Sequence, residues 1–222
     1  MNLTVYQMPH SPYCIPITRA LEALGVGFDV LNVTPHTLEE VIQRSDGKFY
    51  QVPMLDHDGE LVMESSGDSI DIARYVDTTF AGGRLFPRAI EAAHLPLVER
   101  IENEFELAGF VLLDPFYLDS YEDVLIKTLL VRHKERRFGL GCVEQWRKNH
   151  DTLFEEFIRL LAPSERTLSE QTFLFGEVPV YADFALFGVL ENVTYKGYNQ
   201  LPDSVPNLVR WCESLRSFQY PT

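Results

Sequence analysis

The pattern of hydrophobic residues changes once along the chain, and this change limits the possible folds more than any other feature. Residues 3–7 alternate apolar and polar side chains as a strand does, and residues 15–24 repeat apolar side chains at helical spacing. Residues 28–33 form a second β-rich run. After residues 81–88, which contain two glycines and a proline, strand patterns end and helical patterns follow. The sequence therefore predicts a mixed α/β domain followed by a helical domain.

The second half of the α/β domain contains a hairpin signal. Two short β-rich runs, residues 52–55 and 61–63, flank the dipeptide Asp58-Gly59, which is a strong signal for a tight hairpin turn. A short helix is expected before this hairpin, and residues 69–79 return to helical spacing. The predicted order of elements is β-α-β-α-β-β-α.

The domain boundaries follow from these patterns. We expect an α/β domain over residues 1–80, a linker over 81–88 and an all-helical domain over 89–222. Loops are expected at Asp114-Pro115 and over residues 163–171, because proline interrupts helices. The predicted helices of the second domain cover residues 89–112, 120–138, 142–161, 181–195 and 206–217.

Composition narrows the class of partner. The 222 residues carry 33 acidic and 19 basic side chains, a net charge of -14, so the average field repels nucleic acid and anionic lipid. Three cysteines lie far apart, without the close spacing of a metal site, which favours a reducing compartment. The sequence has no apolar run of about 18 residues and no leader pattern. We therefore expect a cytoplasmic protein with no metal, nucleic-acid partner or membrane span.

The turn between the first strand and the first helix carries His10-Ser11-Pro12-Tyr13-Cys14. A helix N-terminus presents backbone N–H groups and the positive end of the helix dipole, so this turn favours an anion such as a thiolate. The motif resembles the Cys-Pro-Tyr-Cys site of glutaredoxins and the Ser-Pro-aromatic site of glutathione transferases. Ser11 stands at the position of the glutaredoxin nucleophile, so the resemblance implies catalytic roles for Ser11 and Cys14. A serine ahead of a helix is also an ordinary N-cap.

Val52-Pro53 adds to the resemblance, because both families place a cis-proline at the start of the third strand, facing that turn. In these families the backbone of the preceding residue, in this chain Val52, pairs with glutathione as an added strand would. The resemblance implies that Gln51 or Lys48 holds the glycine carboxylate. If the family resemblance is set aside, Pro53 also fits an edge proline that begins a strand.

An acidic-Ser pair ahead of an apolar helix forms the third motif. Asp68-Ser69 is in register with the helix that follows, and by resemblance it would bind the γ-glutamyl end of glutathione through the Ser69 N–H and the Asp68 carboxylate. Glu64-Ser65 is a second such pair and lies at the more usual distance from Pro53. Both pairs stay open, and the helix register favours Asp68 and Ser69.

Residues 179–188 resemble the buried helix of the same superfamily, in which Ser or Thr caps the helix three residues before an Asp. Val180 occupies the cap position in this chain, so Asp183 is expected to bond the turn by itself.

Aromatic side chains gather on or just after the first long helix of the second domain. Phe105, Phe110, Phe116 and Tyr117 would line an apolar pocket for a small hydrophobic electrophile, or else pack in the core. Lys134 and its basic neighbours are interpreted as a solvated helix face.

Together these motifs make the chain similar to the glutathione transferase superfamily, with a first domain like that of two-domain bacterial glutaredoxins. The resemblance implies a thioredoxin-like βαβαββα domain, an all-α second domain, a homodimer, and glutathione as co-substrate. The implied activity is a transferase in which Ser11 stabilises the glutathione thiolate for attack on the electrophile. Two alternatives stay open: thiol–disulfide exchange or dehalogenation through Cys14, and a non-catalytic glutathione-binding or interaction module.

Overall fold

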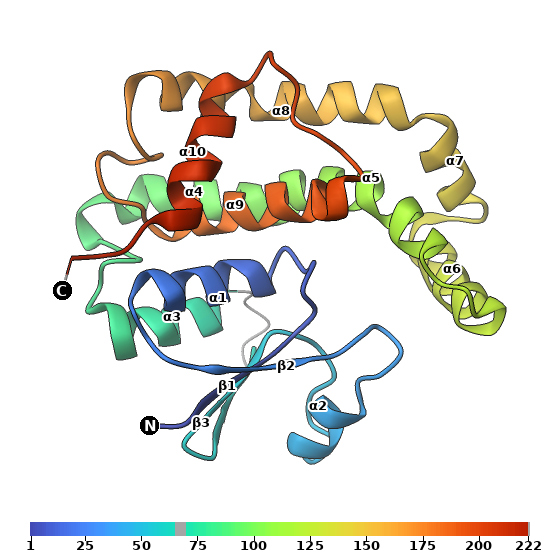
Figure 1. The fold of residues 1–222 in the computed structure, drawn as a ribbon, viewed down its shortest axis with the longest axis horizontal. Helices are drawn as coiled ribbons and strands as arrows, with labels where there is room; N and C mark the ends of the chain where they lie inside the picture. Colours follow the sequence, from blue (N-terminus) through green and yellow to red (C-terminus); the bar gives the residue numbers. More distant parts are fainter. Residues whose placement is uncertain (65–69, 222) are drawn as a thin grey trace.

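One four-stranded mixed sheet, in the order β2-β1-β3-β4, organises the first part of the chain in the computed structural model, which describes residues 1–64 and 70–221 (Figure 1). β1 (Leu3–Gln7) pairs in parallel with β2 (Asp29–Asn32) and antiparallel with β3 (Met54–His57). β3 pairs antiparallel with β4 (Glu60–Val62). The turn that joins β3 to β4 is the predicted Asp58-Gly59 hairpin.

The two faces of the sheet pack on different helices because side chains alternate along a strand. Val5 and Leu55 point into the large core, whereas Tyr6 and Met54 point into a second, smaller cluster. In Figure 1, α1 and α3 lie between the sheet and the helical layer, and α2 lies beyond the other face. The βαβαββα order is therefore confirmed. The helices of this part are α1 (Cys14–Ala23), α2 (Glu39–Arg44), α3 (Asp71–Val76) and the π-helical η1 (Asp77–Ala81).

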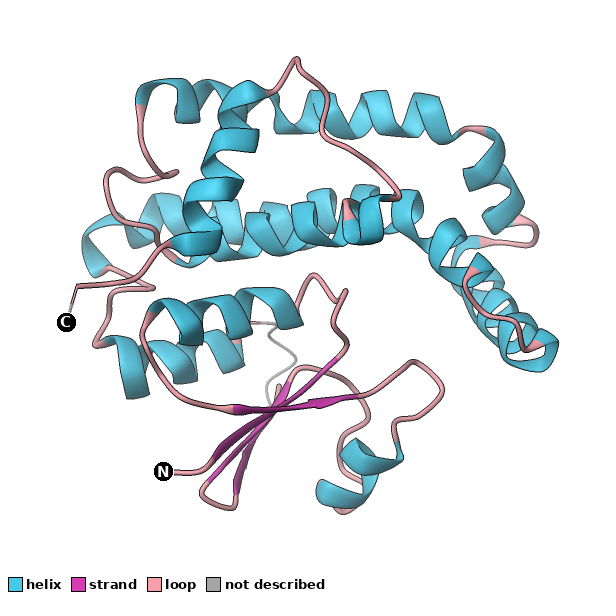
Figure 2. Ribbon diagram, viewed as in Figure 1, coloured by secondary structure: helices cyan, strands magenta, loops and turns pink. Residues whose placement is uncertain are grey.

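The rest of the described chain is helical, as predicted, and Figure 2 shows it without a further named strand. None of the helices in the described residues is both long and apolar enough to cross a membrane. The helices of this part are η2 (Arg88–Ile90), α4 (Glu91–Arg100), η3 (Ile101–Phe105), α5 (Glu106–Asp119), α6 (Val124–Phe138), α7 (Cys142–Lys148), α8 (His150–Glu170), α9 (Tyr181–Val193), η4 (Tyr195–Gly197) and α10 (Pro206–Ser217).

The two loops predicted at prolines are wrong. α5 continues through Asp114 and Pro115, and α8 continues through Pro163 to its end. A proline inside a helix removes one backbone donor and costs about 3 kcal/mol. The apolar stripe of α8 extends on both sides of Pro163, with Leu161 and Leu168 fully buried. Burial of that stripe stabilises the helix across the proline, so the proline does not end it.

The start of α9 is held by a buried carboxylate. Asp183 accepts a hydrogen bond from the backbone N–H of Val180 at 3.0 Å, so it bonds the turn by itself as predicted. It also accepts from the Leu174 N–H at 2.9 Å and from the indole N–H of Trp211 at 3.0 Å. Asp183 therefore ties the preceding loop and α10 to the N-terminus of α9.

α1 is fixed between the sheet and the helical layer. It packs against α9, and a single hydrophobic cluster contains buried residues from both. The buried Arg19 of α1 donates to the Leu215 carbonyl of α10 at 2.8 Å, and the Tyr220 N–H donates to the Ala23 carbonyl at 2.8 Å. These contacts hold the middle and the end of α1, the helix that follows the Ser11 turn, against the second half of the chain.

Candidate functional site

The turn before α1 is organised around Ser11. The Ser11 N–H donates to the Met8 carbonyl at 2.9 Å, which closes the chain back toward the end of β1. The Ser11 Oγ accepts from the backbone N–H groups of Tyr13 and Cys14, each at 3.3 Å. Ser11 therefore caps the helix, and neither of these two bonds uses its hydroxyl hydrogen. Its side chain is among the residues that line the pocket beside this turn.

Cys14 lies one helical turn further on and points away from solvent. Its exposed fraction is 0%. Burial raises the pKa of the Cys14 thiol to about 12, although a hydrogen bond with the Ser11 side chain opposes the shift. A thiol in this setting carries almost no thiolate at neutral pH, and the thiolate is the nucleophilic form.

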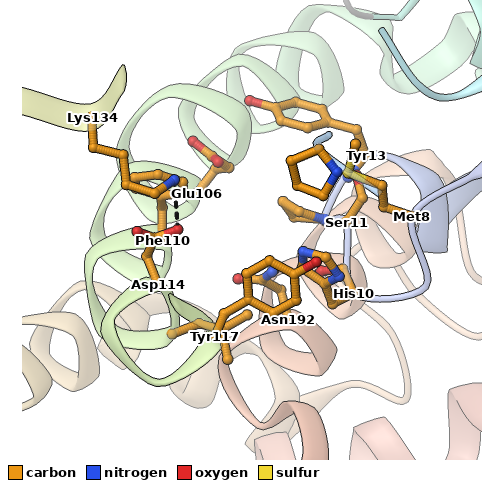
Figure 3. A pocket seen from close by; sticks show the side chains of 13 residues that line it. Met8, His10, Ser11, Tyr13, Glu106, Phe110, Asp114, Tyr117, Lys134 and Asn192 are labelled. Carbon is orange, nitrogen blue, oxygen red and sulfur yellow. Dashed lines mark hydrogen bonds and ion pairs between the residues drawn. The ribbon is translucent and has the colours of Figure 1, made fainter. Parts of the chain in front are cut away.

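The pocket lies between the Ser11 turn and the helices of the second part of the chain. Figure 3 shows Glu106, Phe110 and Asp114 of α5 on one side and the Ser11 turn on the other. The cavity holds about 200 Å³. A cavity of about 150 Å³ is large enough for benzene, so there is room for one substituted aromatic ring.

One face of α5 supplies the wall opposite Ser11. Glu106, Phe110, Leu113, Asp114 and Tyr117 all line the pocket, and their spacing of three or four residues places them on the same side of the helix. This spacing is visible in the sequence and could have identified the wall.

Two of the predicted aromatic residues do not belong to this wall. Phe105 is buried in the core, and Phe116 stacks on Tyr198 with ring centroids 5.4 Å apart. Phe110 and Tyr117 are the members of the predicted set that line the pocket.

The carboxyl of Glu106 is a weaker acid than an ordinary glutamate side chain. Burial raises the pKa of Glu106 to about 7, against the opposing effects of Arg137 and a hydrogen bond with Tyr13. Burial also raises the pKa of the Tyr13 phenol, so Tyr13 stays protonated at neutral pH.

His10 joins the turn to α5 and α9. Its ring lies over Tyr117 with the centroids 4.0 Å apart, and its carbonyl accepts a hydrogen bond from the Asn192 side chain. Burial lowers the pKa of His10 to about 4, and the charges of Lys134 and Lys196 act in the same direction. The imidazole is therefore neutral at physiological pH and contributes an aromatic surface. Among the described residues, no cluster of His, Cys, Asp or Glu is suited to hold a metal ion.

Lys134 is largely buried and paired with Asp114, whereas the sequence analysis interpreted it as part of a solvated helix face. Its Nζ lies 2.8 Å from Oδ1 of Asp114, and the Lys134 and Asp114 side chains are only 14% and 7% exposed. Both line the pocket, so Lys134 is not part of a solvated face. The two residues are twenty positions apart in the chain, on α6 and α5, so no local sequence signal marks them as partners.

The peptide bond between Val52 and Pro53 is cis, as predicted. β3 begins at Met54, which pairs with Tyr6 near the end of β1. Because the two strands run antiparallel, the residues just before β3 stand beside those just after β1. Met8 and Val52 pack against the same small cluster.

The other residues predicted to contact glutathione differ in their exposure and in whether the structure describes them. Lys48 and Gln51 are exposed. Asp68, Ser69 and Ser65 lie outside the described residues, whereas Glu64 is described and half-buried. The choice between the two acidic-Ser pairs therefore stays a prediction.

Gly188 of α9 fits closely against the Ser11 turn, and we expect Gly188→Ala to lower the free energy of unfolding by about 1–3 kcal/mol. A Cβ at this position would lie 2.5 Å from the Pro12 carbonyl oxygen and 2.7 Å from the Pro16 ring. The Pro12 oxygen is backbone, so relief of the clash requires the turn itself to move. Urea-induced unfolding measures the loss.

Gly109→Ala is the matched control on α5. Its Cβ would meet a methyl group of Val193 at 2.7 Å, which is a side chain rather than backbone. Both substitutions gain about the same helix propensity, so the difference between them reports the contact. Equal stability losses in the two variants would show that α9 does not hold the turn in place.

Comparisons with known proteins agree with this arrangement. The family model for the N-terminal domain of glutathione S-transferase matches residues 5–84, and the model for the C-terminal domain matches residues 143–219. A probable glutathione S-transferase from Nicotiana tabacum is 22% identical over 207 residues, which cover 91% of this chain and 78% of the relative.

Solved structures show the same fold. The glutathione S-transferase CsGST63524 of Ceriporiopsis subvermispora, in complex with glutathione, superposes with a TM-score of 0.76 at 17% identity and covers 99% of this chain and 98% of that one. The beta-etherase LigF from Sphingobium sp. strain SYK-6 gives a TM-score of 0.67 at 20% identity, with 98% and 96% covered. With family models matched in both its sheet-containing and its helical part, the chain belongs to the glutathione S-transferase superfamily.

Proposed function

We propose that the protein is a glutathione transferase that activates bound glutathione as a thiolate for attack on a small hydrophobic electrophile. The observation that carries this proposal is the placement of Ser11 and Cys14. Ser11 lines the pocket at the start of α1, whereas Cys14 is fully buried behind it. The side chain that can reach a ligand is therefore a hydroxyl and not a thiol.

Glutathione would lie along the segment that precedes β3. The Val52 backbone would pair with the tripeptide as an added strand, and Gln51 or Lys48, both exposed, would meet the glycine carboxylate. The register of β1 and β3 supports this placement, since it sets Val52 beside the Ser11 turn. The glutathione in the related CsGST63524 structure supports the choice of ligand.

Ser11 would activate the thiol by hydrogen bonding. Its oxygen already accepts two backbone N–H groups, so it would turn its O–H toward the glutathione sulfur. A donor and a helix N-terminus both favour the anion and lower the pKa of the thiol from its ordinary value of about 8.5. The sulfur then forms a bond to the electrophilic carbon, and the leaving group departs with the electron pair of the bond that breaks.

The pocket opposite Ser11 would hold the electrophile. Phe110 and Tyr117 offer aromatic surface, and the neutral His10 ring extends it. An apolar site that adjoins the thiolate suits a substrate that reacts by nucleophilic substitution or addition.

The thiol-exchange alternative requires Cys14 to reach a substrate. Its burial and raised pKa disfavour this alternative, because a mixed disulfide forms from an accessible thiolate. We also propose that the protein acts in the cytoplasm as a homodimer. Light scattering at micromolar protein concentration checks the dimer, and a monomer would contradict that part of the proposal.

Turnover of an activated aryl halide, with glutathione present or withheld, tests the proposed function. We expect halide release and a thioether product only when glutathione is present. Retention on immobilised glutathione without turnover of aryl halide, epoxide, peroxide or disulfide substrates would contradict the enzyme and favour a binding module.

A further inference from the structure

The pocket contains a charged pair that the proposed thiol chemistry does not use. Asp114 of α5 is 6% exposed, and its Oδ1 lies 2.8 Å from the Nζ of Lys134. The same ammonium stands 4.7 Å from the centroid of the Phe110 ring. Figure 3 shows the pair on the side of the pocket opposite the Ser11 turn, with the ion pair drawn as a dashed line.

The second carboxylate oxygen of Asp114 is incompletely satisfied. Oδ2 is buried and has no hydrogen-bond partner among the described residues. A buried acceptor without a partner bears the full cost of its desolvation, and that cost is larger when the group is charged. Oδ2 itself is shielded from water, but Asp114 lines the pocket, so a turn of its carboxylate would bring Oδ2 to a ligand that supplies the missing donor.

The chemistry of the pair restricts the ligand group. Asp114 Oδ2 requires a donor, whereas the Lys134 ammonium is a donor only and requires an acceptor. A hydroxyl group satisfies both with one oxygen, since it donates through its hydrogen and accepts through its lone pairs. A carbonyl offers no hydrogen to Asp114, and a ligand carboxylate would be repelled by it.

The surroundings favour an aromatic body for the same ligand. Phe110 lies beside the pair, and the ring of Tyr117 contacts that of His10 further along the same wall. The cavity of about 200 Å³ accepts one substituted ring. We propose that the pocket selects aromatic electrophiles that carry a hydroxyl group, with the hydroxyl bound between Asp114 Oδ2 and Lys134 Nζ.

This inference rests on the proposed function, and a matched pair of substrates tests it. One is a chlorodinitroarene with a hydroxymethyl group para to the chlorine, and the other carries an ethyl group at that position. The two substituents are nearly isosteric, so the ratio of their kcat/KM values isolates the hydroxyl once each value is divided by the rate constant of the uncatalysed reaction with glutathione. We expect the wild-type protein to prefer the hydroxymethyl compound by about tenfold or more, because loss of the hydroxyl leaves buried polar groups unpaired.

Asp114→Asn should bring this ratio close to one. The amide places N–H donors where Oδ2 accepted, at nearly unchanged volume. A ratio near one in the wild-type protein, or an unchanged preference in Asp114→Asn, would overturn the inference. Lys134→Met serves as a second variant and should also reduce the preference, and a folded state is verified for each by circular dichroism.

A binding measurement separates this inference from the proposed function. Nitrobenzyl alcohol and ethylnitrobenzene lack the chlorine and cannot react, so calorimetry compares their affinities without turnover. A preference of about tenfold for the alcohol that disappears in Asp114→Asn supports the hydroxyl site even if neither chloroarene is conjugated, and in that case the proposed function alone fails. Equal affinities for the two compounds in the wild-type protein would overturn the hydroxyl site.

Discussion

Replacing Asp183 by alanine is expected to lower the free energy of unfolding by about 3–5 kcal/mol. The carboxylate is completely buried and accepts hydrogen bonds from the backbone N–H groups of Leu174 and Val180 and from the Trp211 indole. Alanine would leave all of these buried donors without an acceptor. Urea-induced unfolding of the wild type and the variant measures the difference.

Asp183→Asn and Trp211→Phe are the controls for this result. Asparagine keeps the volume and one acceptor oxygen, but it turns an NH₂ group toward N–H donors, so we expect a large part of the loss to persist. Phenylalanine at position 211 removes the indole donor and also leaves a cavity, because the Trp211 side chain is fully buried, so its cost sets an upper limit on the contribution of this one hydrogen bond. A loss below about 1 kcal/mol in Asp183→Ala would contradict the assignment of this carboxylate as the anchor of α9.

Ser11→Ala is expected to reduce the turnover of an aryl halide at neutral pH by about tenfold to a hundredfold or more. One preorganised hydrogen-bond donor to a developing or bound anion contributes an effect of that size. Cys14→Ser should retain conjugation, because the Cys14 side chain is buried and its thiol is protonated at neutral pH. Both variants are measured in one pH–rate series on an aryl halide and on a mixed disulfide.

Stability is a necessary control, since Ser11 also caps the first helix. Loss of its oxygen removes the acceptor for the Tyr13 and Cys14 N–H groups and should cost about 1 kcal/mol. The loss of the cap alone shifts the unfolding midpoint, whereas the loss of the hydrogen-bond donor to the thiolate moves the pH–rate profile to higher pH, so the two effects are measured separately. Loss of activity only in Cys14→Ser would move the protein to the thiol-exchange class.

Local sequence patterns predicted most of the fold. Alternation in residues 3–7 and the Asp58-Gly59 turn each depend on neighbours in the chain, and the structure contains both elements. The loops expected at Pro115 and Pro163 are wrong because the local cost of proline is offset by burial of helix faces against distant residues. The strength of those distant contacts cannot be derived from a single sequence.

In the candidate site, too, features that depend on neighbouring residues could be predicted from the sequence, whereas contacts between distant helices could not. Ser11 and the cis bond at Val52-Pro53 follow from motifs that occupy a few consecutive positions. The contact between Asp114 and Lys134 depends on how α5 and α6 cross, and the role of Gly188 depends on the approach of α9 to α1. Such contacts between helices carry no signature in the residues themselves, although the helical spacing of the α5 wall was a usable signal.

Titration of the glutathione thiol in complex with the protein tests directly whether Ser11 activates it. Ultraviolet absorbance of the thiolate, followed against pH, gives the pKa of the bound thiol. We expect a pKa at least about one unit below the ordinary value near 8.5 in the wild type, and a return toward that value in Ser11→Ala. Bound glutathione that titrates like free glutathione in the wild-type protein would contradict thiol activation at Ser11.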